Sequence, residues 1–181
     1  YGFKSRNHHK LLVKVFHEKD ISIQVAVGNY DLGICGLDWV EELLAKYTSS
    51  ALVKVKDLGY GEGVLFMAGS SAEISDKSGM MRIASEYPNL AESFALRNRL
   101  RQYSVFPVWG AAEVFPPENA ELALISVRSE ADVDSYGMIP VNKVLEFGAV
   151  IIANKNSWES KDLFDVVTSI CDKLPPTRKR Y

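Results

Sequence analysis

The feature that most constrains the fold is a regular alternation of short apolar runs with segments of helical periodicity. The run "GVLFMAGS" (residues 63–70) is apolar throughout, as in a strand buried on both faces. By contrast, "LDWVEELLAKY" (37–47) places its aliphatic residues along one face of a helix. Further strands are predicted at 11–16, 30–36, 51–60, 81–87, 104–109, 120–127 and 149–157, and helices at 19–29, 88–103, 110–119 and 158–174. The alternation predicts an α/β fold with mixed, mainly parallel sheets.

Two polar or glycine-bearing crossings divide this pattern. The segment "SSAEISDKSG" (70–79) and the glycine at 148 are typical of places where a chain passes from one lobe to another. They predict a first lobe of residues 1–75 plus 148–181 and a second lobe of residues 76–147. In such a two-lobed fold a ligand binds in the cleft, at the carboxyl ends of the strands.

A glycine-rich stretch, "GNYDLGICGLDW" (28–39), ends one predicted strand and begins the next helix. Glycine at such a position allows a ligand or another backbone to approach closely. Tight packing of the helix on the sheet explains Gly33 and Gly36 equally well, with Asp38 as an acid near a helix N-terminus. The pattern leaves both interpretations open. A second glycine cluster, "DLGYGEG" (57–63), favours a structural turn, since a strand follows it instead of a helix.

The stretch "VRSEADVDSYG" (127–137) follows a buried strand, where a catalytic loop would lie. A loop that holds phosphate requires glycine, hydroxyl groups and free N–H donors. Here Glu130, Asp132 and Asp134 stand against Arg128 alone, so the loop would repel phosphate unless a metal ion or a basic partner intervened. Upstream, Glu113 follows a strand end by a few residues and either faces the cleft or begins a solvated turn.

Composition excludes several classes of protein. A net charge of −2 argues against a nucleic-acid or anionic-membrane surface, and no apolar run is long enough to span a bilayer. The two cysteines are expected to be reduced thiols, although a disulfide is possible. The three histidines lack the spacing of a zinc site, and no metal ligand is assigned. Neither a nucleophile elbow nor a complete phosphate-binding loop of a known type is present.

Several stretches, in order along the chain, resemble the catalytic subunit of ATP phosphoribosyltransferase. "GNYDLGICGLDWVEE" is similar to the family's Ala-Asp-Leu-Gly-Ile-x-Gly-x-Asp segment, and "RIASEYPNLAESF" to its Tyr-Pro-Asn segment. "VKDLGYGEGVLFMAG", "WGAAEVFPPENAELALI" and "SYGMIPVNKVLEFGAVIIANKNSW" resemble three further family segments. The resemblance extends from about residue 11 to residue 170, and its collinearity is stronger evidence than any single motif.

The resemblance implies a two-lobed fold like that of type II periplasmic binding proteins. It implies the first step of histidine biosynthesis, in which N1 of ATP attacks C1 of phosphoribosyl pyrophosphate and pyrophosphate leaves with the help of Mg²⁺. Such chemistry needs positioning and charge stabilisation more than a protein nucleophile. By the same resemblance Asp31, Gly33, Gly36 and Asp38 would line the cleft, and Glu113 would face the substrates. The 5′-phosphate of the sugar would be bound by Val127, Arg128, Ser129, Glu130, Ala131 and Asp132.

Three departures from the family pattern stand out. The family loop reads roughly Asp-x-Val-Ser-Ser/Thr-Gly-x-Thr-Leu, whereas this chain has Ile125, Glu130 and Asp132 in place of the leading Asp, the Gly and the Thr. The family's opening strand, with its Pro-Lys-Gly-Arg segment, has no counterpart. The chain also ends soon after its last predicted helix, as in the short form of the family, which implies a histidyl-tRNA-synthetase-like regulatory subunit as partner.

Three functions remain open from the sequence. The first is a cytoplasmic, homo-oligomeric enzyme that binds ATP and phosphoribosyl pyrophosphate, with no nucleic-acid or membrane partner. The second is a catalytically impaired homologue that acts as a ligand-binding or regulatory subunit, for which the acidic loop would be tolerated. The third is a solute-binding protein of the same two-lobed class.

Overall fold

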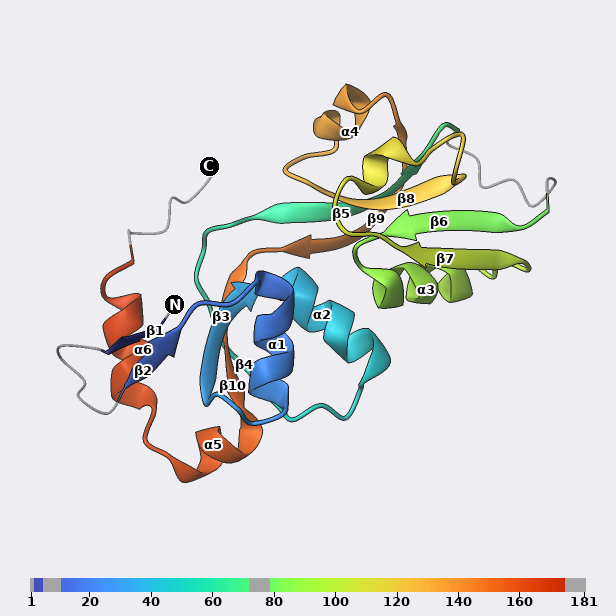
Figure 1. Ribbon diagram of the computed structural model, residues 1–181. Helices are drawn as coiled ribbons and strands as arrows, with labels where there is room; N and C mark the ends of the chain where they lie inside the picture. Colours follow the sequence, from blue (N-terminus) through green and yellow to red (C-terminus); the bar gives the residue numbers. More distant parts are fainter. Residues whose placement is uncertain (1, 5–10, 72–78, 175–181) are drawn as a thin grey trace.

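The computed structural model describes residues 2–4, 11–71 and 79–174, and two larger β-sheets dominate it (Figure 1). The first sheet has three strands in the order β3-β10-β4, and its central strand is antiparallel to both neighbours. The strands are β3 (Leu32–Gly36), β4 (Leu52–Asp57) and β10 (Ala149–Asn154), and the helices around them are α1 (Glu18–Ala26), α2 (Leu37–Lys46), α5 (Lys155–Ser160) and α6 (Phe164–Cys171).

Both faces of this first sheet are covered, as the alternation of side chains along β10 shows. Val150 and Ile152 pack with residues of α1 and α2, whereas Ile151 between them packs with α6. A strand whose successive side chains all meet helices must be apolar at every position, which explains the run "AVIIA". All four residues Val150–Ala153 are at most 1% exposed.

The second sheet has five strands in the order β7-β6-β8-β5-β9. Strand β6 is parallel to β7 and β8, and β5 is antiparallel to β8 and β9. The elements are β5 (Gly63–Gly69), β6 (Met81–Ser85), β7 (Tyr103–Pro107), β8 (Leu122–Val127), β9 (Ile139–Phe147), α3 (Pro88–Arg97), the 3-10 turn η2 (Ala112–Val114) and α4 (Ala131–Ser135).

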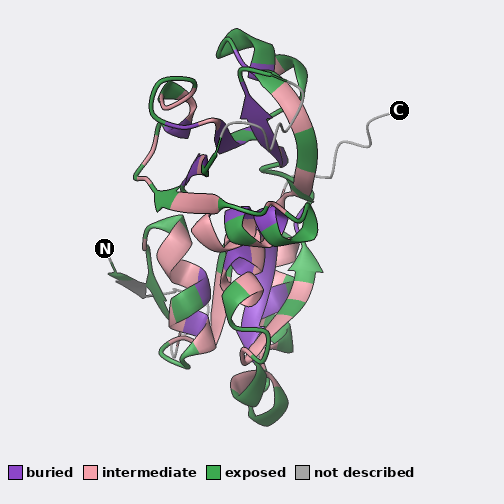
Figure 2. Ribbon diagram, turned by 90° about the vertical axis from the view of Figure 1, so that its right-hand side faces the viewer, coloured by how far each residue is buried: buried purple, intermediate pink, exposed green. Residues whose placement is uncertain are grey.

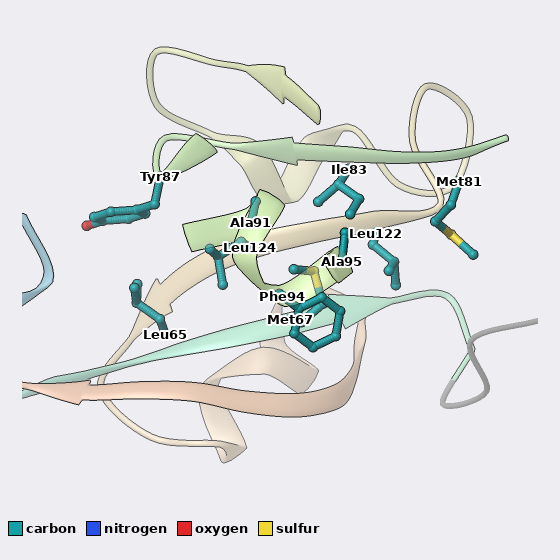
Figure 3. Packing of buried hydrophobic residues seen from close by; sticks show 10 residues of the cluster. All are labelled: Leu65, Met67, Met81, Ile83, Tyr87, Ala91, Phe94, Ala95, Leu122 and Leu124. Atoms are coloured by element: carbon teal, nitrogen blue, oxygen red, sulfur yellow. The ribbon is translucent and has the colours of Figure 1, made fainter. Parts of the chain in front are cut away.

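The core of the second sheet also lies on two faces. On one, Ala91, Phe94 and Ala95 of α3 pack against alternate residues of the strands, including Met67 (Figure 3). On the other, Phe66 packs in a cluster with residues near η2 and α4. Figure 2 shows buried residues concentrated in the strands of both sheets. The predicted mixed α/β fold is therefore confirmed, although antiparallel strand pairs outnumber parallel ones.

The chain passes between the two sheets at residues 58–62 and again at Gly148. Leu37 N donates a hydrogen bond to Gly148 O at 2.9 Å, and Ala149 N donates to Tyr60 O at 2.8 Å, so the two crossings are bound to each other. The predicted first crossing near Ser75 assigns residues 63–69 to the first lobe. That boundary is wrong, because β5 pairs with β8 and β9 over its whole length and belongs to the second sheet.

Two further elements differ from the predictions. Residues 139–147 form the long strand β9, where no element is predicted because Pro140, Asn142 and Lys143 interrupt the apolar pattern. The single helix predicted at 158–174 is two helices, α5 and α6, because Lys161 takes an extended conformation between them. The side chain of Asn154 begins α5 by accepting hydrogen bonds from Asn156 N and Ser157 N.

Strand β3 lies at the edge of the first sheet. Within the described residues it pairs with β10 only, and Ile34 in it is 39% exposed. A hollow of about 280 Å³ lies beside this edge and is lined mainly by apolar side chains, Leu12 and Val15 among them. Leu12 belongs to β2 (Leu12–Lys14), which pairs with β1 (Gly2–Lys4) in a separate two-stranded sheet. No helix in the described ranges could cross a bilayer.

Candidate functional site

Two carboxylates of α2 hold the second sheet's helix α3 in place. Tyr87, the residue before α3, donates its hydroxyl hydrogen to Asp38 Oδ2 at 2.7 Å. One turn further along α2, Glu42 accepts from Asn89 N at 2.9 Å and from Leu90 N at 2.8 Å. These two N–H groups are in the first turn of α3 and have no partner within their own helix. We call these contacts the α2–α3 clasp, and it joins the two sheets.

Burial determines the electrostatics of the clasp. Asp38 is 3% exposed and Glu42 is 7% exposed. Burial, which penalises the charged form, raises the pKa of both carboxyl groups above its ordinary value, and the hydrogen bonds from Tyr87 and from the α3 backbone only partly oppose it. Asp38 Oδ1 is buried and has no hydrogen-bond partner within the described part of the chain.

Gly36 and Gly33 serve packing in this structure. A Cβ on Gly36 would overlap Asp38 Oδ1, so glycine there lets the carboxylate lie against the backbone at the start of α2. A Cβ on Gly33 would lie 2.7 Å from Ile21 Cγ2 and 2.9 Å from Val25 Cγ2, both on α1. Of the two interpretations left open by the sequence, close packing is therefore the one that the geometry favours.

Asp31 lies with α5 and not with Asp38. Its Oδ1 accepts from Ser157 Oγ at 2.6 Å and from Lys161 Nζ at 2.8 Å. The hydrogen bond from Lys161, followed by that from Ser157, holds the pKa of Asp31 below its ordinary value. Asp31 precedes β3, whereas Gly36 ends it, so the two residues lie at opposite ends of the strand. The structure therefore does not bring Asp31 together with Gly36 and Asp38, and the implied role of these residues and Gly33 in lining a cleft stays a prediction.

The loop after β8 binds its own carboxylate. Arg128 N and Ser129 N both donate to Asp132 Oδ2, at 3.1 Å and 2.9 Å. Val127 is buried, whereas Arg128, Ser129, Glu130 and Ala131 are exposed. The donors that a phosphate would need are thus occupied by an acid from the same loop.

Glu113 lies in η2, whose Ala112 packs in the cluster with Phe66 on the face of the second sheet away from α3. The residue is half-buried, and Ala112 beside it is buried in the core. Within the described residues its carboxylate makes no hydrogen bond, and it lines neither of the two hollows described next. Its predicted role stays a prediction.

Two hollows lie between the sheets, and both include residues of α2. The first, the hinge hollow, has about 510 Å³ and is lined by the crossing segments and by residues near them, including Leu37, Tyr60, Glu62, Arg128 and Glu146. The described residues contain no group of three His, Cys, Asp or Glu side chains that could hold a metal ion.

The second hollow, the tryptophan cavity, has about 530 Å³ and lies between α1 and α2 on one side and the segments after β6 and β7 on the other. Its lining includes Lys19, Trp39, Glu86, Asn89 and Trp109. The sequence prediction missed both this cavity and the clasp. The "YPN" motif at 87–89 marks the clasp, but its partners on α2 are more than forty residues earlier in the chain.

Comparison with known proteins shows the family. The family model described as ATP phosphoribosyltransferase matches residues 17–175. An ATP phosphoribosyltransferase of Prosthecochloris aestuarii is 28% identical over 165 residues, which are 86% of this chain and 54% of that protein. One of Metallosphaera sedula is 33% identical over 149 residues, which are 80% of this chain and 50% of that protein. The chain thus spans about half the length of the curated relatives it matches.

A solved structure, an ATP phosphoribosyl transferase (HisG:HisZ) complex from Thermotoga maritima, has the same fold, with a TM-score of 0.73. The match covers 90% of this chain and 77% of that chain at 20% identity. Sequence family and fold agree, and the match includes α2, α3 and the loop after β8. The chain therefore belongs to the ATP phosphoribosyltransferase family.

Proposed function

We propose that this chain carries the catalytic part of an ATP phosphoribosyltransferase, which transfers the phosphoribosyl group from phosphoribosyl pyrophosphate to N1 of ATP. The observation that carries the proposal is the family match, which spans residues 17–175. The arrangement of two sheets with hollows between them supports it, since two substrates must meet in one enclosed place.

In this reaction the N1 lone pair of adenine attacks C1 of the sugar. The bond from C1 to the pyrophosphate oxygen breaks, and the pyrophosphate leaves with the electron pair. Bound Mg²⁺, carried by the substrate's phosphate oxygens, would neutralise charge on the leaving group. Among the described residues that line the hinge hollow, Arg128 is the one with a positive charge, and we assign it to binding the phosphate groups. Glu113 is kept as the candidate acid on the second sheet.

The experiment is an assay of pyrophosphate release from phosphoribosyl pyrophosphate, ATP and Mg²⁺. Arg128→Ala is expected to reduce kcat/KM for phosphoribosyl pyrophosphate at least about tenfold. Arg97→Ala removes an exposed guanidinium at the end of α3 and serves as the matched control. A folded protein that releases no pyrophosphate and binds neither substrate in calorimetry contradicts the proposal.

The proposal includes partners and location. The complex from Thermotoga maritima pairs two kinds of chain, and we propose a corresponding regulatory subunit, similar to histidyl-tRNA synthetase, for this protein. Homo-oligomerisation and a cytoplasmic location belong to the same proposal. Size-exclusion chromatography with light scattering tests the oligomeric state.

One observation favours a second function, a non-catalytic ligand-binding or regulatory homologue. Asp132 occupies the N–H groups of Arg128 and Ser129, where the resemblance implies the 5′-phosphate. A carboxylate held in that position repels a phosphate by charge and blocks its donors. Binding of ATP without any turnover, in the assay above, is the result expected of this second function.

A further inference from the structure

The two sheets are linked by crossing segments that have the character of a hinge. In the first crossing, residues 58–62, Gly59 and Gly61 have φ angles of 69° and 65°, which side chains rarely adopt. The second crossing is at Gly148, whose carbonyl oxygen accepts a hydrogen bond from Leu37 N. A few loop residues between two packed bodies are the usual place where a rotation of one body on the other is absorbed. A rotation about the crossings would leave both sheets intact and would change the contacts between them.

The α2–α3 clasp is a contact that such a rotation must break. Asp38 and Glu42 are four positions apart on α2, so they lie on the same face of the helix. Both bond to the segment that begins α3, through the Tyr87 hydroxyl and through the N–H groups of Asn89 and Leu90. With the clasp formed, which we call the closed state, both carboxylates are buried. With the clasp broken, which we call the open state, water reaches both of them.

Burial of these two carboxylates makes closure depend on protons. Neither forms an ion pair with a lysine or arginine of the described chain. A buried carboxyl group without a bound cation favours its protonated form, whereas a carboxyl group in water titrates near its ordinary pKa. Burial in the closed state raises the pKa of both Asp38 and Glu42. Closure therefore takes up protons, and opening releases them.

The charged neighbours of the clasp do not reverse this preference. Lys46, one turn after Glu42 on α2, lowers the pKa of Glu42, but burial has the larger effect. Glu18 of α1 raises the pKa of Asp38 further. The other titratable groups around the clasp are Lys19 and Asp20 of α1, Cys35 of β3, and Glu86 and Tyr87 before α3. Burial raises the pKa of the thiol and of the phenol, so both are neutral, and the one further cation faces two further acids.

We propose that the α2–α3 clasp is a proton-dependent latch between the two sheets, which is closed while Asp38 and Glu42 are protonated and opens as they ionise. The pKa values of the closed state lie above the ordinary 3.8 and 4.5, so acid favours closure and the latch loosens as the pH rises through the closed-state values. The hinge hollow and the tryptophan cavity are each lined by residues of α2 and by residues of the second sheet. The width of both therefore depends on pH.

The test measures the distance between spin labels on the two sheets by pulsed electron paramagnetic resonance. The labels are attached to Glu159→Cys on α5 and Glu92→Cys on α3, which are both exposed positions. Cys171→Ser removes the partly exposed native thiol, and Cys35 is buried. From pH 5 to pH 8 the population with the longer distance is expected to grow. The ratio of open to closed molecules changes by up to about tenfold per pH unit for each carboxyl group that ionises.

Variants of the labelled chain identify the groups responsible. Asp38→Asn/Glu42→Gln cannot ionise at the clasp, so its distance distribution is expected to be the same from pH 5 to pH 8. Glu42→Gln alone is expected to reduce the pH dependence, because Asp38 still titrates. Glu41→Gln is the matched control, since it neutralises the neighbouring carboxylate on α2 outside the clasp, and it is expected to follow the labelled chain.

Circular dichroism at each pH confirms that the proteins are folded. The proposal is overturned if the labelled chain gives one distance distribution at every pH, if the longer distance grows as the pH falls, or if the double variant keeps the pH dependence. Should the double variant fail to fold, Glu42→Gln takes its place, and an undiminished pH dependence then overturns the proposal. The measurement needs no substrate, so its outcome is separate from that of the turnover assay.

Discussion

Truncation of Glu42 is the sharpest test of the α2–α3 clasp. Glu42→Ala leaves the N–H groups of Asn89 and Leu90 without the carboxylate oxygens that lie 2.9 Å and 2.8 Å away. An unsatisfied donor costs about 1–3 kcal/mol when buried, and the lower figure applies here because both residues are half-buried and water can reach part of the gap. Two such donors give a loss of about 2 kcal/mol in the free energy of unfolding. For a chain of this length that loss corresponds to about 4–8 °C in Tm.

The assay is equilibrium unfolding in urea, followed by circular dichroism and tryptophan fluorescence. Glu42→Gln retains one acceptor oxygen and is expected to lose about half as much stability, near 1 kcal/mol. Glu41→Ala, one position earlier on the same helix, removes a carboxylate that makes no hydrogen bond with the rest of the described chain, and it is expected to change stability by less than about 0.5 kcal/mol. Equal losses for Glu42→Ala and Glu41→Ala would refute the reasoning.

Three further predictions concern the same region and its neighbours. Burial raises the pKa of Asp38 above its ordinary 3.8, so folding favours the protonated carboxyl group. The stability that this group contributes is therefore fully present below pH 3.8 and is lost as the pH rises through its pKa in the folded protein. The free energy of unfolding of Asp38→Asn, measured in urea from pH 4 to pH 7, should therefore rise relative to that of the unchanged chain as the pH increases. A difference between the two free energies that stays constant with pH would contradict this. Gly33→Ala places a Cβ within 3 Å of Ile21 and Val25, so it is expected to lower the free energy of unfolding in urea by about 1–3 kcal/mol. An unchanged free energy of unfolding would contradict this and would mean that α1 moves aside. Asp132→Ala frees two backbone donors and removes a negative charge, so calorimetry with inorganic phosphate should show binding at least about fivefold tighter than for Asp132→Glu; unchanged affinity would mean that the loop is not an anion site.

The fold was largely predictable because its buried strands are marked by composition. The runs at 63–69 and 149–153 are apolar at almost every position, and this pattern depends only on helices covering both faces of a sheet. Strand β9 escaped prediction because most of its residues are partly or fully exposed, and its polar residues do not alternate strictly with apolar ones. The predicted position of the first crossing was wrong because an apolar run such as β5 fits a buried strand of either sheet, and no local pattern indicates which one it joins.

The candidate site was less predictable, since its parts depend on pairings between distant residues. Asp31 is bound by Lys161, 130 positions later, and no local pattern marks the pair. The sequence singles out Gly36 and Asp38 as unusual, but it does not show that the Asp38 side chain turns back toward Gly36. Trp109 attracted no attention in the sequence because its exposure is set by the turn that follows β7.

The edge strand β3 has a consequence for how this protein behaves at high concentration. Along the side away from β10, its backbone N–H and C=O groups have no strand partner among the described residues. An open edge of this kind, next to exposed apolar side chains such as Ile34 and Val15, is a template on which the strand of another molecule can add. Addition of a strand at this edge is therefore a route by which the isolated chain can self-associate at high concentration.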